Sequence, residues 1–164
     1  MNFQQTFKEI TSSQIFKDFI KKNKNAKLYE GFFIIDFFGN DNKKSLNYRV
    51  NNEIFTFSLN DFGKVVMEKD KLIKEDSYFE EIDPIINYDI EDIENIVKIK
   101  TSDEGIKSKF NKIIAVLQNF KNQQLWNLTC MLDGLIILHI IIDSKSGELK
   151  KFERKSFMDL VRKK

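Results

Sequence analysis

The chain of 164 residues contains one cysteine, one histidine, one proline and six glycines. A single cysteine excludes an intramolecular disulfide and leaves no set of thiols for a structural zinc site. The sequence has no phosphate loop, dinucleotide-binding fingerprint, nucleophile elbow or metalloprotease motif. These absences favour a non-catalytic protein over an enzyme, and we expect no cofactor.

Long hydrophobic runs are also missing. The longest apolar run is Leu135–Ile142, and His139 interrupts it, whereas a membrane-spanning helix needs about 20 apolar residues. The N-terminal residues 1–10 lack the basic and apolar regions of a signal peptide. We therefore expect a cytoplasmic protein that does not contact a membrane.

No charge of one sign dominates, because 27 basic residues face 25 acidic ones. This balance argues against a general polyanion binder. Only residues 145–164 form a basic tail, in which apolar residues alternate with cations. Such a tail can dock as a terminal helix, pair with the chain's own acidic middle, or contact nucleic acid or an anionic membrane. We favour docking and do not expect nucleic acid as the main partner.

The first half of the chain predicts a helix followed by strands. Ser12 or Ser13 can cap a helix with its apolar residues on one stripe, and Phe3–Ile10 can add a separate turn upstream. Aromatic and β-branched residues then predict strands at Leu28–Phe38, Ser45–Val50 and Glu53–Leu59, with a two-residue turn at Asn51-Asn52.

Residues 61–100 predict an acidic connecting segment. We expect a strand near residues 63–73 and a short helical turn before Pro84, and Ile90–Ile99 fits either a helix or a strand. Four carboxylates could in principle bind a hard cation, but their spacing fits no EF-hand loop and favours a solvated surface. These carboxylates are Asp89, Glu91, Asp92 and Glu94.

The second half repeats the pattern of the first. Thr101–Glu104 has the form of a capping box, which predicts a helix whose apolar stripe runs from Ile106 to Phe120. Three strands are expected after it, near residues 124–132, 135–143 and 148–153. The sequence therefore predicts an α+β fold of two αβββ halves with antiparallel sheets. They span residues 1–60 and 101–164, joined by 61–100 in one compact unit.

The second half also resembles a PepSY-type module. The resemblance rests on Trp126, on the I-D-S-K-S-G-E run of residues 142–148, and on residues 98–101 leading into the expected helix. Residues 16–36 and 45–57 resemble small archaeal proteins that end in such a module. The resemblance implies a cystatin-like sheet and a role in inhibition, regulation or binding, and it transfers no catalytic residue.

The hairpin turn at Asp133-Gly134 predicts that Leu132 lies opposite Leu135. In that register Cys130 and His139 are diagonal neighbours on one face of the sheet. A cysteine beside a histidine can form a nucleophilic pair. Because the other residues of this face are apolar, we favour a core covered by the preceding helix, and Cys130 remains a weak reactive candidate.

The opposite face of the hairpin also needs a cover, because residues 135–142 are apolar on both sides. Its cover could be the first half of the chain, a second copy, or an apolar ligand in a curved sheet. A separate hypothesis is a small ligand on a concave sheet face lined by His139 and Trp126. The candidate pocket or interface residues are Trp126, Thr129, Met131, Ile136, Leu138, His139 and Ile140. We expect a binding or regulatory protein, inhibitor-like, whose partner is another protein or a second copy in a homodimer. The alternatives are a small-ligand protein or enzyme, and a nucleic-acid partner through the tail.

Overall fold

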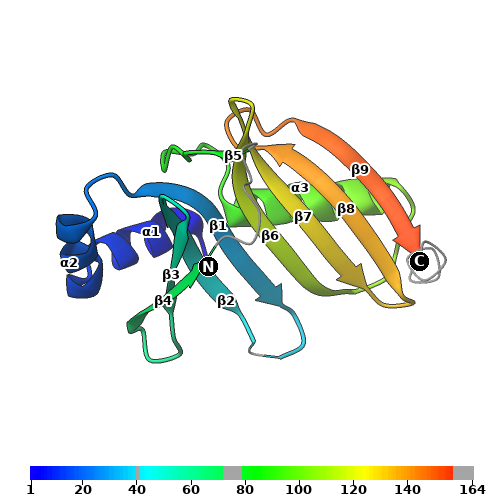
Figure 1. Ribbon diagram of the computed structural model, residues 1–164. Helices are drawn as coiled ribbons and strands as arrows, with labels where there is room; N and C mark the ends of the chain where they lie inside the picture. Colours follow the sequence, from blue (N-terminus) through cyan, green and yellow to red (C-terminus); the bar gives the residue numbers. More distant parts are fainter. Residues whose placement is uncertain (40, 72–78, 157–164) are drawn as a thin grey trace.

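The computed structural model describes residues 1–39, 41–71 and 79–156, which fold into helices on one side of a sheet (Figure 1). The helices in these ranges are α1 (Phe3–Thr11), α2 (Gln14–Lys22) and α3 (Ile90–Asp103). The strands are β1 (Lys27–Asp36), β2 (Lys43–Val50), β3 (Glu53–Leu59), β4 (Val65–Lys71), β5 (Phe79–Glu80), β6 (Phe110–Phe120), β7 (Gln123–Leu132), β8 (Ile136–Asp143) and β9 (Leu149–Ser156). The mixed α+β class is confirmed.

The strands form one antiparallel sheet in the order β4-β3-β2-β1-β6-β7-β8-β9. The short β5 lies beside the end of β6. Strand β1 pairs with β2 on one side and with β6 on the other. The two halves of the chain therefore share a continuous sheet, and four strands follow the helical part of each half rather than the three expected.

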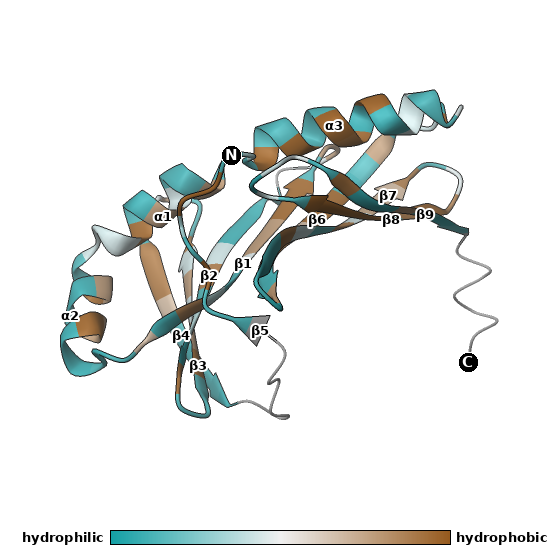
Figure 2. Ribbon diagram, turned by 90° about the horizontal axis from the view of Figure 1, so that it is seen from above, coloured by the Kyte–Doolittle hydropathy of each residue, from teal (hydrophilic) through white to brown (hydrophobic). Residues whose placement is uncertain are grey.

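The helices lie along one side of the sheet, which is bent, and the other side carries no helix within the described ranges (Figure 2). Alternate residues of each central strand point to the helices and are buried there. Helix α3 packs on them through Ile90, Ile93, Val97 and Thr101, one stripe at helical spacing. The buried residues form one core that includes Phe3, Phe33, Phe57, Trp126, Leu128 and Ile140.

The N-terminal predictions are confirmed. Ser13 caps α2, its hydroxyl accepting a hydrogen bond from the Phe16 amide. The upstream residues form α1, a helix of their own. Strands β2 and β3 meet at the predicted turn, where Asn51 adopts a φ of 55°. The strand expected near residues 63–73 is β4.

The helix predicted to begin at Thr101 is wrong. Residues 101–103 form the last turn of α3, and the Thr101 hydroxyl donates to the Val97 carbonyl instead of capping a helix. The capping box in the structure is formed by Asp89 and Asp92, at the N-terminus of α3. Residues 90–99, which fitted either a helix or a strand, are therefore helical.

The stripe from Ile106 to Phe120 belongs mainly to strand β6. Ile113, Ala115 and Leu117 alternate toward the core, and β6 lies between β1 and β7. The apolar residues match a helical period as well as an alternating one, and pairing on both edges decides for the strand. The helical turn expected before Pro84 is also wrong, because residues 79–80 form strand β5.

The register predicted for the β7–β8 hairpin is wrong by one residue. Leu132 pairs with Ile136, and the loop contains three residues, Asp133, Gly134 and Leu135. Gly134 and Leu135 both adopt positive φ, 83° and 60°. Because side chains alternate along a strand, this shift moves the whole of β8 to the opposite face from the one predicted.

Candidate binding face of the sheet

The corrected register divides the predicted site residues between the two faces of the sheet. Four of them, Trp126, Ile136, Leu138 and Ile140, point toward the helices. Trp126 is fully buried, donates from Nε1 to the Tyr88 carbonyl at 2.8 Å, and packs edge-on against Phe3. These residues belong to the core and cannot line a pocket with His139.

Cys130 and His139 lie on opposite sides of the sheet. Cys130 faces the helices, pairs across the strands with Leu138, and is fully buried. Burial raises the pKa of its thiol to about 12, which keeps it protonated at neutral pH. The nucleophilic pair that the sequence left open is therefore not formed.

His139, Thr129 and Met131 lie together on the side without helices. His139 is half-buried, and its Nε2 lies 2.8 Å from the amide oxygen of Asn127. An amide oxygen can only accept, so Nε2 carries the proton. Burial, and then the ammonium of Lys151, lower the pKa of His139, with Glu153 opposing them. The imidazole is therefore neutral at physiological pH.

The neighbours of His139 form three cross-strand rows, which we call the open face. The register gives Phe32–Val116–Asn127–Ile141–Lys151, then Ile34–Ile114–Thr129–His139–Glu153, then Asp36–Lys112–Met131–Ile137–Lys155. Directly opposed residues of antiparallel strands point to the same side, so each row is a line of neighbouring side chains. The open face has apolar side chains around a small polar centre, and its margin is charged.

The apolar side chains of the open face are all half-buried. Their neighbours on the sheet cover their flanks, and no helix of the described residues covers their tips. Ile114 and Val116 belong to the segment expected to be a helix, so sequence reasoning missed them. The signal in the sequence was an alternating pattern typical of a strand, in which Ile113, Ala115 and Leu117 alternate with Ile114 and Val116.

Three lysines and two carboxylates form the margin of the open face, where Asp36 of β1 lies directly across from Lys112. Lys151 and Lys155 approach the same carboxylate of Glu153, at 3.1 and 3.6 Å. Lys112 lies across from Met131 on β6. Exposed ion pairs of this kind contribute little to stability, so these ammonium groups remain available to an incoming anion.

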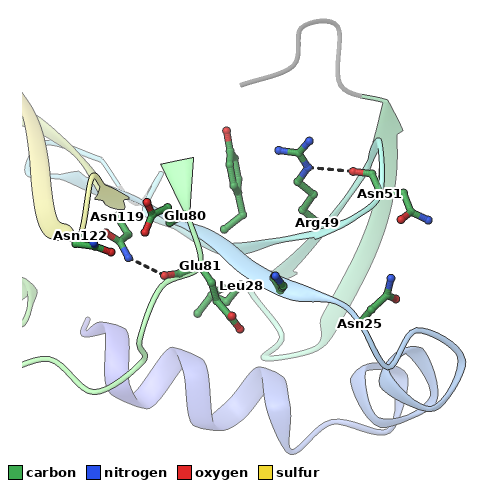
Figure 3. A pocket seen from close by; sticks show the side chains of 10 residues that line it. Asn25, Leu28, Arg49, Asn51, Glu80, Glu81, Asn119 and Asn122 are labelled. Atoms are coloured by element: carbon green, nitrogen blue, oxygen red, sulfur yellow. Dashed lines mark hydrogen bonds between the residues drawn. The ribbon is translucent and has the colours of Figure 1, made fainter. Parts of the chain in front are cut away.

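A separate polar pocket of about 850 Å³ lies where β1, β2, β5 and the β6–β7 turn meet (Figure 3). Arg49 Nε donates to the Asn51 carbonyl at 3.0 Å, and Asn119 Nδ2 donates to the Glu81 carbonyl at 2.9 Å. The pocket is lined by Asn25, Lys27, Leu28, Tyr29, Arg49, Asn51, Glu80, Glu81, Asn119 and Asn122. None of the predicted site residues lines it.

The acidic group of residues 89–94 serves the helices. Asp89 and Asp92 form the capping box of α3, and Glu94 forms an ion pair with Lys98 at 3.2 Å. In the ranges that the structure describes, no three side chains of His, Cys, Asp or Glu gather as a metal site. Residues 157–164 of the predicted basic tail lie outside the described residues.

Comparison with known proteins gives a fold and no family. No protein-family model matches this sequence, and no curated protein matches it. A solved structure from Clostridium difficile, described as a "putative lipoprotein", has a similar fold, with a TM-score of 0.53 and 14% sequence identity. The alignment covers 86% of this chain and 90% of that chain. In this chain, no described helix has the length and apolarity needed to cross a bilayer.

Proposed function

We propose that this chain is a non-catalytic protein-binding module that uses the open face to bind another protein. The observation that carries the proposal is the composition of that face. Apolar side chains from four strands surround the Asn127–His139 hydrogen bond, and charged groups lie at the margin. Protein interfaces have this same arrangement of an apolar centre with few polar groups and a polar rim.

The charges of the margin support a partner that is acidic where it meets β9. Lys151 and Lys155 outnumber Glu153 at the β9 side of the open face. In a two-fold symmetric dimer whose axis passes beside β9, these lysines would approach the same lysines of the second copy. A different protein that presents apolar residues flanked by carboxylates would complement both the centre and the margin.

The proposal also includes a regulatory role and a relationship to PepSY-type modules. A regulatory or inhibitor-like role and a PepSY-like or cystatin-like relationship are supported by α3 followed by antiparallel strands, and by the turn at residues 143–147. Residues 98–101 count against that relationship, because they end a helix rather than lead into one. A cytoplasmic location is also part of the proposal, and the free thiol of Cys130 suits a reducing compartment.

Photo-crosslinking from the open face tests this function. A benzophenone amino acid at Ile137 should capture a specific protein in cells, whereas the same group at Phe62, which is 92% exposed on the β3–β4 turn, should not. The captured protein would then be identified and purified, and its affinity measured directly. If crosslinks form only between copies of this chain, the open face is the interface of a homodimer and the proposed binding of a different protein is wrong.

Variants of the open face complete the test. The double substitution Ile114→Thr and Ile141→Thr keeps β-branched residues and removes apolar contact, so it should weaken the purified complex by about tenfold or more. Ile85→Thr, at a side chain that is 70% exposed and lies outside the sheet, is the control, and it should leave the affinity unchanged. Thermal unfolding of each variant would verify that it folds. Equal affinities for all the variants would refute the proposed surface.

A further inference from the structure

Strand β9 forms one edge of the sheet. It pairs with β8 from Ser156 to Leu149, and no other described strand lies beside it. An edge strand presents backbone N–H and C=O groups that can accept a further strand. Many proteins bind extended peptides in this way, with main-chain hydrogen bonds for affinity and alternate side chains for specificity.

Half of the side chains of β9 are cationic. Lys150, Lys151, Arg154 and Lys155 accompany the single carboxylate of Glu153. On the open face, Lys151 and Lys155 share that carboxylate. Arg154, on the other side, is exposed and makes no ion pair within the described part of the chain. The strand therefore carries more positive charge than its own carboxylate balances.

This charge decides which strand β9 can accept. A second copy of β9 would bring four more cations to the edge, and lysines on edge strands are a known defence against such self-pairing. The opposite edge differs, because β4 carries Glu68 and Asp70 beside Lys69 and Lys71. Of the two end strands in the described sheet, β9 is the one with an excess of one charge, so an acidic strand fits it better than a neutral or basic one.

We propose that β9 binds an extended acidic peptide segment as an additional strand, with carboxylates beside Lys151 and Lys155. This inference rests on the proposed function, and it names the part of the partner that reaches the edge of the open face. Two carboxylates on that side would each lie next to a lysine, and the position between them would lie next to Glu153. The alternate side chains would lie on the other side, next to Phe152 and Arg154, since side chains alternate along a strand.

A synthetic peptide tests the inference without the natural partner. The probe is a capped peptide of about ten alternating valine and glutamate residues, the usual upper length of a strand. Calorimetric titration should show binding, and hydrogen exchange should show slower exchange of the β9 amides. The same peptide with glutamine in place of glutamate should bind about tenfold more weakly or not at all.

Paired variants separate strand addition from general charge attraction. Lys151→Gln with Lys155→Gln should weaken binding of the glutamate peptide by about tenfold. Lys17→Gln with Lys21→Gln, on exposed positions of α2, removes the same charge and should change nothing. An equal loss in both variants, or no protection of β9 amides, would overturn the inference. Equally tight binding of a short DNA oligonucleotide at the same lysines would overturn it too.

The two proposals fail separately. The open-face variant Ile114→Thr with Ile141→Thr retains all of the β9 lysines, so it should still bind the peptide even where it loses the protein partner. If that variant loses the partner and the wild-type chain does not bind the peptide, the proposed binding function is kept and the acidic strand is rejected. If the variant still binds the partner and the wild-type chain binds the peptide, the open face is rejected and strand addition at β9 is kept.

Discussion

At the scale of single residues, one carboxylate joins the two helical parts of the molecule. Asp89 Oδ1 accepts from the amides of Ile90 and Phe3 at 2.7 and 2.6 Å, and Oδ2 accepts from the amide of Gln4 at 3.0 Å. Asp89 therefore satisfies free amides at the first turns of both α3 and α1. Asp89, one of the four carboxylates for which a solvated surface is the favoured prediction, is the N-cap of α3 and an acceptor for the first turn of α1.

The substitution Asp89→Ala should lower the free energy of unfolding by about 2 kcal/mol, because it leaves amides of two helix N-termini without an acceptor. Urea unfolding followed by circular dichroism measures this change. Glu91→Ala, in the same first turn of α3, is the matched control and should have a small effect. A loss no larger than that of the control would show that the two helices do not depend on this carboxylate.

His139 makes the stability of the protein depend on pH in a defined window. Burial and Lys151 lower its pKa below the ordinary value of 6.5. As the pH falls through that value, the unfolded chain binds a proton before the folded chain does, so stability falls with it. The loss ends once the pH is below the pKa of the folded state.

The variant His139→Gln should remove this loss and keep the hydrogen bond to Asn127. Melting temperatures between about pH 7.5 and about pH 5.5 should fall less for the variant than for the wild type, since this is the only histidine. The same slope in both proteins would place the pH dependence elsewhere.

At the scale of elements, the β7–β8 loop decides which residues the open face contains. The sequence predicts a two-residue Asp-Gly turn, and the structure adds Leu135 to the loop with a φ of 60°. Leu135 is 65% exposed, so burial does not hold it in this conformation. The pairing of β8 with both β7 and β9 holds Leu135 in this conformation. A shift of β8 by one residue would turn the core side chains of β8 outward.

Substitutions of Leu135 should reveal this strain. Leu135→Gly should raise the free energy of unfolding by about 1 kcal/mol, because glycine adopts the left-handed conformation without a steric penalty. Leu135→Val should lower it by a similar amount, about 1 kcal/mol, since a β-branched residue fits that conformation poorly. Urea unfolding of both variants measures the difference. A valine variant as stable as the wild type would contradict the left-handed loop.

At the scale of the whole molecule, β1 makes one unit out of the two halves of the chain. It pairs with β2 and β6, and its Phe33 ring lies 6.2 Å from Phe3 and 6.0 Å from Trp126. The core beneath the helices is continuous across this strand. A substitution at Phe33 should therefore destabilise both halves of the chain.

The variant Phe33→Ala should lower the free energy of unfolding by about 3–5 kcal/mol through lost contacts and a cavity. The tryptophan fluorescence of the second half and the circular dichroism of the whole chain should shift together during denaturation. Phe38→Ala, at a side chain that is 70% exposed, should have little effect. Separate transitions for the two signals would show that the halves unfold independently.

The sequence by itself determined the local elements with strong signals, among them the Ser13 cap, the strands β1 to β3, the last three strands, and the α+β class. These depend on contacts between residues close in the chain, so composition and capping groups suffice to predict them. It placed the second long helix wrongly, because Thr101–Glu104 and Asp89–Asp92 both resemble a capping box and only packing selects one.

Only the tertiary structure decided the role of residues 110–120, the register of β8 and the separation of Cys130 from His139. Residues 110–120 fit a helical and an alternating pattern equally, and pairing with β1 and β7 makes them a strand. A one-residue difference in a loop then exchanges the faces of β8, because the side-chain period of a strand is two residues. The open face arises from such long-range pairing, which local sequence does not encode.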